Sequence, residues 1–317
     1  MSEDIEIIDA HHHFWDLNKN YYPFLSDKID PDFFLGNYKS IRKNYLPVDY
    51  IKDIKSHNII GTVHCEAEWD RQDQVGETKW LEKVSKKNKF PNAIVGHAWF
   101  HKNNAEAVIA EQASFDIVKG IRSKPTVKFS RNSLQYIKDG SMKDEKWRSG
   151  LKLLEKYNLN YDLRVPCWHL KEAVEIVRLI PNTKVVINHA GFPWDRSKEG
   201  MDFWRKGIRL ISLEPNTFIK LSEFGVNGQD WNYAENANII YELIDFVKIK
   251  MSGLLSPDVE ESITGSAEIL EIFKVSKVGK VAGSKVTTGE ISQDSLARVI
   301  RDLSLIHISE PTRLLSI

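Results

Sequence analysis

The chain has 317 residues, 42% of them hydrophobic and 28% charged, which is enough to bury the core of one large or two ordinary domains. Its 44 basic and 44 acidic residues cancel, so the sequence offers no overall field that would attract nucleic acid or an anionic membrane. No apolar run approaches the roughly 20 residues that span a bilayer, and the acidic N-terminus lacks the layout of a signal peptide.

Short apolar segments alternate with amphipathic segments along the first three quarters of the chain. The apolar segments predict strands at residues 5–10, 58–67, 93–100, 115–122, 159–165, 184–190 and 217–223. Apolar residues at three- and four-residue spacing predict helices at 74–87, 104–113, 144–157 and 170–180. This alternation predicts βαβ units and a parallel sheet. Because no glycine-rich phosphate loop follows any strand, a closed (β/α)8 barrel is favoured over an open nucleotide-binding sheet.

The cysteine content indicates a reducing environment. Only Cys65 and Cys167 occur, and both lie in apolar, strand-like segments. Two thiols in a chain of this length do not predict a disulfide framework. The cytoplasm is therefore the expected location.

The sequence IDAHHHFWD at residues 8–16 ends the first predicted strand. Side chains alternate faces along a strand, so Asp9, His11 and His13 share one face and His12 points to the other. In a parallel barrel, the carboxyl ends of the strands carry the active site. Two imidazoles there can bind one metal ion or one substrate oxygen. The alternatives are a surface cluster or histidines satisfied within the core.

Other predicted strands also end in residues that can do chemistry. His189 ends an apolar strand before the turn Ala-Gly-Phe-Pro, where it can polarise a carbonyl or handle a proton, or else cap the turn. Arg122 ends the fourth strand, where it can bind a carboxylate, stabilise an oxyanion or form a structural salt bridge. His97 and Arg164 also end strands and are candidates for lining the pocket.

Six fragments in chain order resemble the amidohydrolase-related barrel family, in its sugar-lactonase-like and dicarboxylate-lactonase-like branch. The resemblance covers about residues 4–240. The fragments are IDAHHHFWD (8–16), ETKWLEKV (77–84), VGHAWF (95–100), VKGIR (118–122), VVINHAGFPW (185–194) and FIKLSEFG (218–225).

The resemblance implies a TIM-barrel hydrolase that opens a cyclic ester, above all a sugar lactone, by attack of water on the carbonyl. It implies that His11, His13 and His189 hold a divalent metal such as Zn or Mn, or stabilise the oxyanion directly. Arg122 would position the substrate. The pocket would be lined by Trp15, His97, Arg164 and Trp194.

The resemblance stops before the family's eighth strand, because nothing after Phe224 fits that strand or supplies its Asp or Asn. Residues 239–302 instead resemble the C-terminal part of bacterial translation initiation factor 2. Within them, glycine turns between apolar segments predict strands of a partial β-barrel. Residues 303–313, LSLIHISEPTR, resemble a translated sequencing adapter, a kind of segment to be excluded from fold reasoning.

These breaks predict a chimera. Its expected parts are a (β/α) barrel at 1–240 that is truncated before its eighth strand, an initiation-factor-like segment at 241–302 and an artefactual tail at 303–317. An artefactual join somewhere near 225–246 explains them better than a natural fusion. The hydrolase prediction therefore describes the parent enzyme of residues 1–240, and whether this chain is itself active stays open.

Two other functions stay open at this point. The first is metal-dependent nonoxidative decarboxylation of an aromatic or unsaturated acid, on the same fold. The second is an RNA- or ribosome-binding module carried by residues 239–302, against which the neutral net charge argues. The expected partner is a small-molecule lactone or carboxylate, with no membrane and no nucleic acid.

Overall fold

The computed structural model describes residues 5–31, 33, 36–128, 130–133, 137–251, 264–275, 279–292, 298–301 and 304–308. The chain divides into two compact units, Met1–Trp231 and Asn232–Ile317. The boundary predicted between residues 240 and 241 falls inside helix α8 (Tyr233–Met251). Of the predicted tail, residues 303 and 309–317 lie outside the described residues.

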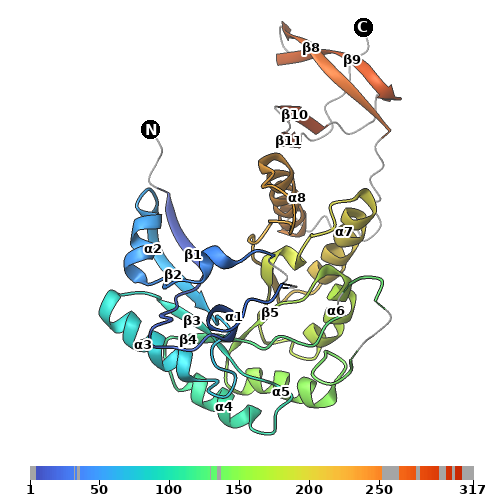
Figure 1. Cartoon of the computed structure of the whole chain (residues 1–317). Coiled ribbons are helices and arrows are strands. Elements are labelled where there is room, and N and C mark those ends of the chain that lie inside the picture. Colours follow the sequence, from blue (N-terminus) through green and yellow to red (C-terminus); the bar gives the residue numbers. More distant parts are fainter. Residues whose placement is uncertain are drawn as a thin grey trace. The chain divides into compact units, whose positions relative to one another are not determined.

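The first unit, here called the barrel unit, is built on one parallel sheet of seven strands in the order β1 to β7 (Figure 1). All seven predicted strands are present, and most are shorter than predicted at their ends. Their bounds are β1 (Glu6–His12), β2 (Asn58–Cys65), β3 (Ala93–His97), β4 (Val118–Arg122), β5 (Asn160–Leu163), β6 (Val185–Ile187) and β7 (Thr217–Ile219).

Helices connect the strands and lie outside the curved sheet (Figure 1). The four predicted helices are confirmed as α3 (Gly76–Asn88), α4 (Ala105–Ala113), α5 (Glu145–Lys156) and α6 (Leu170–Arg178). The prediction missed α7 (Lys198–Ser212) and the short α1 (Pro23–Ser26) and α2 (Pro47–Ile54). Three-residue and four-residue 3-10 helices occur at Lys39–Ile41, Cys167–His169 and Asn188–Gly191.

The sheet is a barrel without its eighth strand, as the sequence predicted. Among the described residues, β1 and β7 each pair with one neighbouring strand, so both are edge strands. A closed barrel would have no such edges. Ile8 on β1 and Phe218 on β7 are 62% and 50% exposed, which is unusual for apolar residues on central barrel strands.

The core of the barrel unit is packed with aromatic side chains between the sheet and its helices. Trp147 on α5 and Trp204 on α7 are fully buried, as is Phe100 just after β3. The rings of Phe100 and Trp147 meet edge to face with centroids 5.4 Å apart. All nine tryptophans of the chain lie within Met1–Trp231, so tryptophan fluorescence reports on the barrel unit alone.

Replacing Gly150 with alanine is expected to destabilise the barrel unit by about 1–3 kcal/mol, because α5 approaches the chain after β3 too closely to admit a methyl group. A Cβ atom at Gly150 would lie 2.7 Å from both Cα and Cβ of Phe100. Urea unfolding followed by tryptophan fluorescence measures the effect. Gly61→Ala is the matched control, since its nearest neighbour lies 3.8 Å away. Equal midpoints for the two variants would contradict the prediction.

The second unit contains helix α8 and two antiparallel strand pairs. Strand β8 (Gly265–Val275) pairs with β9 (Gly279–Gly289), and β10 (Arg298–Arg301) pairs with β11 (Ser304–Ile308). These antiparallel pairs confirm the predicted change from alternating strands and helices to neighbouring strands. Residues 252–263, part of the segment that resembles initiation factor 2, lie outside the described residues.

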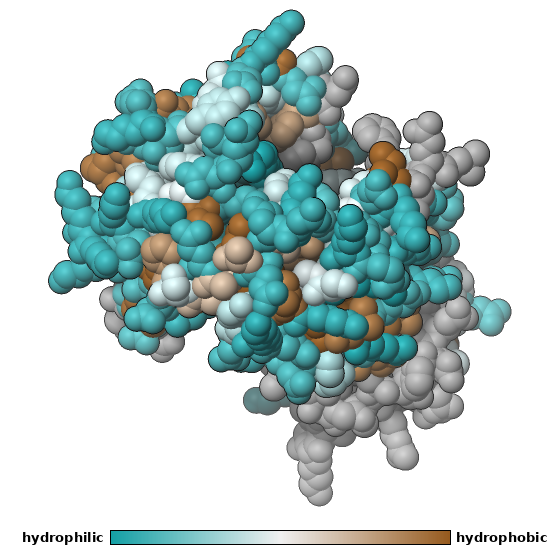
Figure 2. All heavy atoms as spheres, turned by 90° about the horizontal axis from the view of Figure 1, so that it is seen from below, coloured by the Kyte–Doolittle hydropathy of each residue, from teal (hydrophilic) through white to brown (hydrophobic). Residues whose placement is uncertain are grey.

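The visible face of the surface is mostly hydrophilic. Seen from below, the molecule carries mostly hydrophilic residues with apolar ones scattered among them (Figure 2). Within the described residues, none of the helices has the length and apolar content that crossing a membrane requires. Cys65 and Cys167 are buried and free of disulfide bonds.

Candidate active site

Three predicted histidines meet at the carboxyl ends of the strands. The ring centroid of His11 lies 5.0 Å from that of His13 and 4.6 Å from that of His189. His12 points away and packs against Tyr50, with centroids 5.0 Å apart. His189 lies in a tight turn directly after β6 and has a φ of 54°, a left-handed conformation that is strained for a residue with a side chain. This turn directs the His189 ring toward β1.

The three imidazoles are uncharged. Burial lowers the pKa of His13 to about 3 and the pKa of His189 to about 2, with the nearby guanidinium of Arg122 acting in the same direction. The pKa of His11 is lowered furthest, again chiefly by burial. His13 Nδ1 lies 2.8 Å from the carbonyl oxygen of Cys65 and donates its proton there. Its Nε2 therefore carries a lone pair.

Arg122 at the end of β4 supplies a buried positive charge beside the histidines. Its Nε donates to Glu66 Oε1 at 2.7 Å, and its Nη2 donates to the backbone oxygen of Glu66. Its Nη1 faces His11 Nε2 at 3.5 Å and Asn188 Oδ1 at 3.4 Å. His11 thus accepts at Nε2 and carries its proton on Nδ1, which is buried and has no hydrogen-bond partner among the described residues.

A second buried cation lies in the barrel interior. Lys220, directly after β7, donates to Asp162 Oδ2 at 2.6 Å and to Cys65 Sγ at 3.1 Å. Asn188 Nδ2 donates to the same Asp162 oxygen at 2.9 Å, which links Lys220 to Arg122. Although burial opposes it, the neighbouring Cys65 sulfur and Asp162 carboxylate raise the pKa of Lys220, so the ammonium stays protonated. The positive charges of Arg122 and Lys220 therefore lie beside the three uncharged histidines.

His189 is held by the two residues that follow Leu221. The Ser222 hydroxyl lies 2.9 Å from His189 Nδ1, and Glu223 Oε2 lies 3.0 Å from His189 Nε2. The imidazole donates its Nε2 proton to the carboxylate, and the serine hydroxyl donates to Nδ1. Burial raises the pKa of Glu223. Both ring nitrogens of His189 therefore have hydrogen-bond partners.

These donor directions do not fit the three-histidine metal site that the resemblance implies. A ligating imidazole must offer a lone pair to the metal. His189 offers none, and His11 Nε2 faces the guanidinium of Arg122. His13 alone presents a lone pair, with its other nitrogen on a carbonyl as ligating histidines often have. Within the described ranges, no group of three or more His, Cys, Asp or Glu side chains is arranged to hold a metal ion.

The predicted lining residues lie around this centre in different ways. Trp15 belongs to a buried apolar cluster and stacks beside His13, with centroids 6.2 Å apart. His97 is buried, with Nδ1 4.0 Å from Glu66 Oε2. Arg164 lies over the ring of Phe192 at 4.8 Å, and its pKa falls to about 10 through burial. The Trp194 ring contacts the same phenylalanine at a tilt, with ring centroids 4.5 Å apart.

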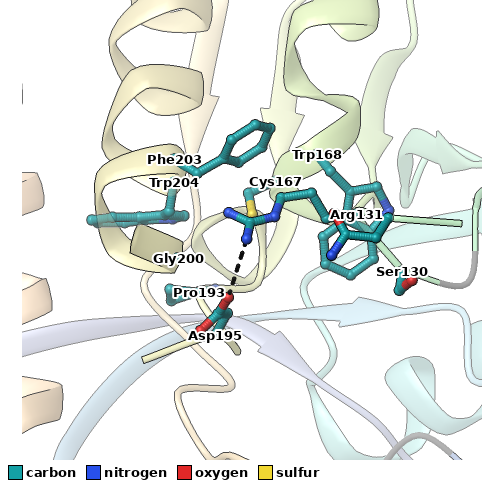
Figure 3. A pocket seen from close by; sticks show the side chains of 10 residues that line it. Ser130, Arg131, Cys167, Trp168, Pro193, Asp195, Gly200, Phe203 and Trp204 are labelled. Carbon is teal, nitrogen blue, oxygen red and sulfur yellow. Dashed lines mark ion pairs between the residues drawn. The ribbon is translucent and has the colours of Figure 1, made fainter. Parts of the chain in front are cut away.

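A cavity of about 200 Å³ lies along the same carboxyl-end loops (Figure 3). Trp168 and Cys167 come from the segment after β5, Pro193 and Asp195 from the segment after β6, and Arg131 from the long loop before α5. Arg131 lies 4.0 Å from Asp195 across this cavity, as the dashed line in Figure 3 marks. Trp168 contacts Trp194 at 6.3 Å, so an aromatic wall joins the cavity to the histidine centre.

Sequence reasoning missed several residues of the centre. Glu66 follows β2, and Lys220 and Glu223 follow β7, so each stands where a barrel strand ends. The same rule that selected Arg122 could have selected them. Glu77 lies nearby, and its buried carboxylate accepts the Ala67 backbone NH at 3.0 and 3.1 Å.

The stability of the barrel unit is expected to fall as the pH is lowered from about 6.5 toward 4. Burial lowers the pKa of His12 and of His97 to about 4. At a pH between its folded and unfolded pKa values, each histidine is protonated in the unfolded chain but not in the folded chain. The free energy of unfolding therefore falls by up to about 1.4 kcal/mol per pH unit for each histidine. Urea midpoints by tryptophan fluorescence measure this slope. His12→Phe should make it shallower, and a flat profile in the parent would refute the prediction.

Comparison with known proteins places most of the chain in one family. Residues 8–251 match the protein family described as Amidohydrolase. The protein y4mH of Sinorhizobium fredii, described as uncharacterized, is 35% identical over 230 residues, which are 72% of this chain and 76% of that protein.

Solved structures share the fold. An amidohydrolase from Burkholderia multivorans with bound HEPES has a TM-score of 0.59 and 20% identity, over 75% of this chain and 78% of that one. A structure of that amidohydrolase with bound zinc has the same TM-score at 19% identity, over the same shares of the two chains. A probable 2-pyrone-4,6-dicarboxylic acid hydrolase from Acinetobacter baumannii, with citric acid bound, has a TM-score of 0.52 and 16% identity, over 78% and 79%.

A further segment has a different origin. It is 64% identical over 70 residues to translation initiation factor IF-2 of Pelagibacter ubique and 57% identical over 70 residues to IF-2 of Brucella ovis. The match covers 22% of this chain but only 10% and 7% of those proteins. A barrel with an amidohydrolase fold is thus joined to a small piece similar to a translation factor.

Proposed function

Because the chain belongs to the amidohydrolase family, we propose that its barrel unit hydrolyses a cyclic ester, a sugar lactone in the first place, by attack of water on the ring carbonyl. One observation carries the proposal. Three uncharged imidazoles, His11, His13 and His189, cluster beside the buried guanidinium of Arg122 at the carboxyl ends of the strands. Such a centre binds a neutral carbonyl compound and stabilises negative charge that develops on it.

The catalytic roles follow from the hydrogen positions. The Nδ1 proton of His11 has no partner among the described residues and is free to bind the substrate carbonyl oxygen. Arg122 and Lys220 stabilise the oxyanion through their charge, in a buried region where a dipole or charge acts strongly. His13 Nε2 accepts a proton or hydrogen bond from the substrate or water. Collapse of the tetrahedral intermediate then breaks the ring C–O bond.

The substrate class is supported by the charges around the centre. Arg164 directly follows β5 and the cavity residue Arg131 lies in the loop after β4, so both cations come from segments at the carboxyl ends of strands, as the histidines do. They suit a lactone that bears hydroxyl or carboxylate groups. The fold shared with a probable 2-pyrone-4,6-dicarboxylic acid hydrolase supports the same class. The expected compartment is the cytoplasm, where the two free thiols stay reduced.

The proposed route uses no step through a metal ion, since the donor atoms do not converge on one. Zinc or manganese at His11, His13 and His189 would require the rings of His11 and His189 to give up their present partners. Chelation with EDTA followed by gel filtration should therefore leave turnover unchanged. Loss of turnover that added zinc or manganese restores would show that the donors rearrange around a metal.

The proposal is tested with the purified full chain on aldonic 1,4-lactones and on 2-pyrone-4,6-dicarboxylate, with acid release followed in a pH-stat. One acid equivalent should be released per lactone, at a rate above the uncatalysed reaction, and His11→Phe should abolish the excess. Release of carbon dioxide from an aromatic carboxylic acid would instead establish the decarboxylase alternative. No turnover of either class would refute a hydrolase or decarboxylase role for this chain.

The junction between the amidohydrolase-like and initiation-factor-like segments can be tested in the source DNA. Single-molecule sequencing of the source DNA across codons 215–260 should show two separate genes, with the amidohydrolase frame running on into an eighth strand. The reason is physical, because β1 and β7 are open edges that such a strand would close. Reads that carry the join intact would establish a natural fusion and remove this explanation of the open barrel.

A further inference from the structure

Glu223 has an unusual combination of backbone and side-chain features. Its φ is 55°, in the left-handed region that residues with a side chain rarely adopt. Its Oε2 lies 3.0 Å from His189 Nε2. Its Oε1 is buried and has no hydrogen-bond partner among the described residues. A strained backbone that leaves a carboxylate oxygen buried and unpartnered is costly unless something binds there.

The neighbours of Glu223 fix which way the carboxylate faces. Ser222 donates its hydroxyl to His189 Nδ1 at 2.9 Å, so the imidazole carries its proton on Nε2 and gives it to Glu223 Oε2. The ring of His189 in turn lies 4.6 Å from that of His11, whose free Nδ1 proton is the proposed carbonyl donor. The unpartnered oxygen of Glu223 thus belongs to the same centre as the donor that would hold the substrate.

We propose that Glu223 is a catalytic residue of the lactone hydrolysis described above, whose Oε1 holds the attacking water. This inference rests on the proposed function. The water oxygen forms a bond to the ring carbonyl carbon, and the carbonyl π electrons move onto the oxyanion. Glu223 takes one proton from the water. When the oxyanion collapses, the ring C–O bond breaks, and the same proton passes to the leaving alkoxide.

His189 is then a positioning residue in this step. Held by Ser222 on one side, it anchors one carboxylate oxygen so that the other is presented to the water. Because Glu223 takes the proton from the water, His13 can use the lone pair on its Nε2 to bind a substrate hydroxyl. It also gives a reason for the strain at residue 223, because a residue with a negative φ would direct the carboxylate elsewhere.

The test uses Glu223→Gly in the full chain, because glycine accepts the positive φ and the variant should fold at least as well as the parent. With an aldonic 1,4-lactone, kcat should fall about 100-fold or more while KM stays within about twofold. Sodium formate should restore kcat at least tenfold, since formate can occupy the vacated carboxylate position. Glu68→Gly is the matched control, because Glu68 also has a positive φ, of 62°, and should keep its kcat.

A second measurement separates this inference from the proposed function. Nitrogen NMR of histidine-labelled protein should show His189 protonated on Nε2 in the parent and altered in Glu223→Gly. If the parent turns over no lactone, the proposed function fails, and this inference fails with it even where the NMR contact is present. If the parent is active but formate gives no rescue, or if the His189 signals do not change, Glu223 is not the water-binding residue.

Discussion

Replacing Arg122 with methionine is expected to lower the free energy of unfolding of the barrel unit by about 3 kcal/mol, because it strands a buried carboxylate. Glu66 is fully buried and accepts Arg122 Nε at 2.7 Å. Although burial alone would raise its pKa, the charge of Arg122 holds the pKa of Glu66 below its usual value. Breaking a buried ion pair usually costs about 3–5 kcal/mol of stability. We expect the low end of this range because Lys124 remains 3.1 Å from Glu66.

The double variant Glu66→Leu/Arg122→Met should recover most of this loss, to within about 1 kcal/mol of the parent, since no buried charge is then left without a partner. Lys124 keeps its ion pair with Glu68 in that variant. Urea unfolding followed by tryptophan fluorescence gives both values. Glu82→Ala, which breaks an exposed pair with Lys86, should cost less than about 0.5 kcal/mol. A double variant no more stable than Arg122→Met would contradict the ion-pair explanation.

The alternation of strands and helices could be predicted from the sequence because it depends on local patterns. Each barrel strand is a short apolar segment, and each of α3 to α6 has apolar residues at helical spacing, so periodicity alone located them. Helix α7 was missed although its buried residues, among them Trp204 and Ile208, follow the same spacing. The helix begins after Ser197, which caps it by accepting from Gly200 N.

The candidate site could be predicted only in part, because its partners are far apart in the sequence. Strand alternation placed His11 and His13 on one face, and the structure brings His189 to them. The contact between Arg122 and Glu66 spans 56 residues and that between Lys220 and Cys65 spans 155, and no local pattern encodes either. The left-handed turns at His189 and Glu223 could not be predicted either, since residues with a side chain rarely adopt that conformation.

Loss of Arg122 should also slow catalysis strongly, independently of its effect on stability. In the stable double variant Glu66→Leu/Arg122→Met, kcat/KM for the lactone should fall by about 100- to 1,000-fold, the usual cost of removing one oxyanion donor from a buried site. The guanidinium acts where His11 and Asn188 meet, at 3.5 and 3.4 Å, so a methionine there leaves the carbonyl oxygen without its nearest positive charge.

Comparing the parent, Arg122→Met and the double variant separates the effect on catalysis from the effect on stability. Arg122→Met alone mixes unfolding with lost catalysis, whereas the double variant keeps the fold and removes the guanidinium together with its Glu66 partner. Lys220, which Asp162 holds at 2.6 Å, stays in place in both variants and accounts for the turnover that remains. If the double variant folds like the parent and keeps kcat/KM within threefold, Arg122 serves only to neutralise Glu66, and the oxyanion must be stabilised by Lys220 and the His11 Nδ1 proton instead.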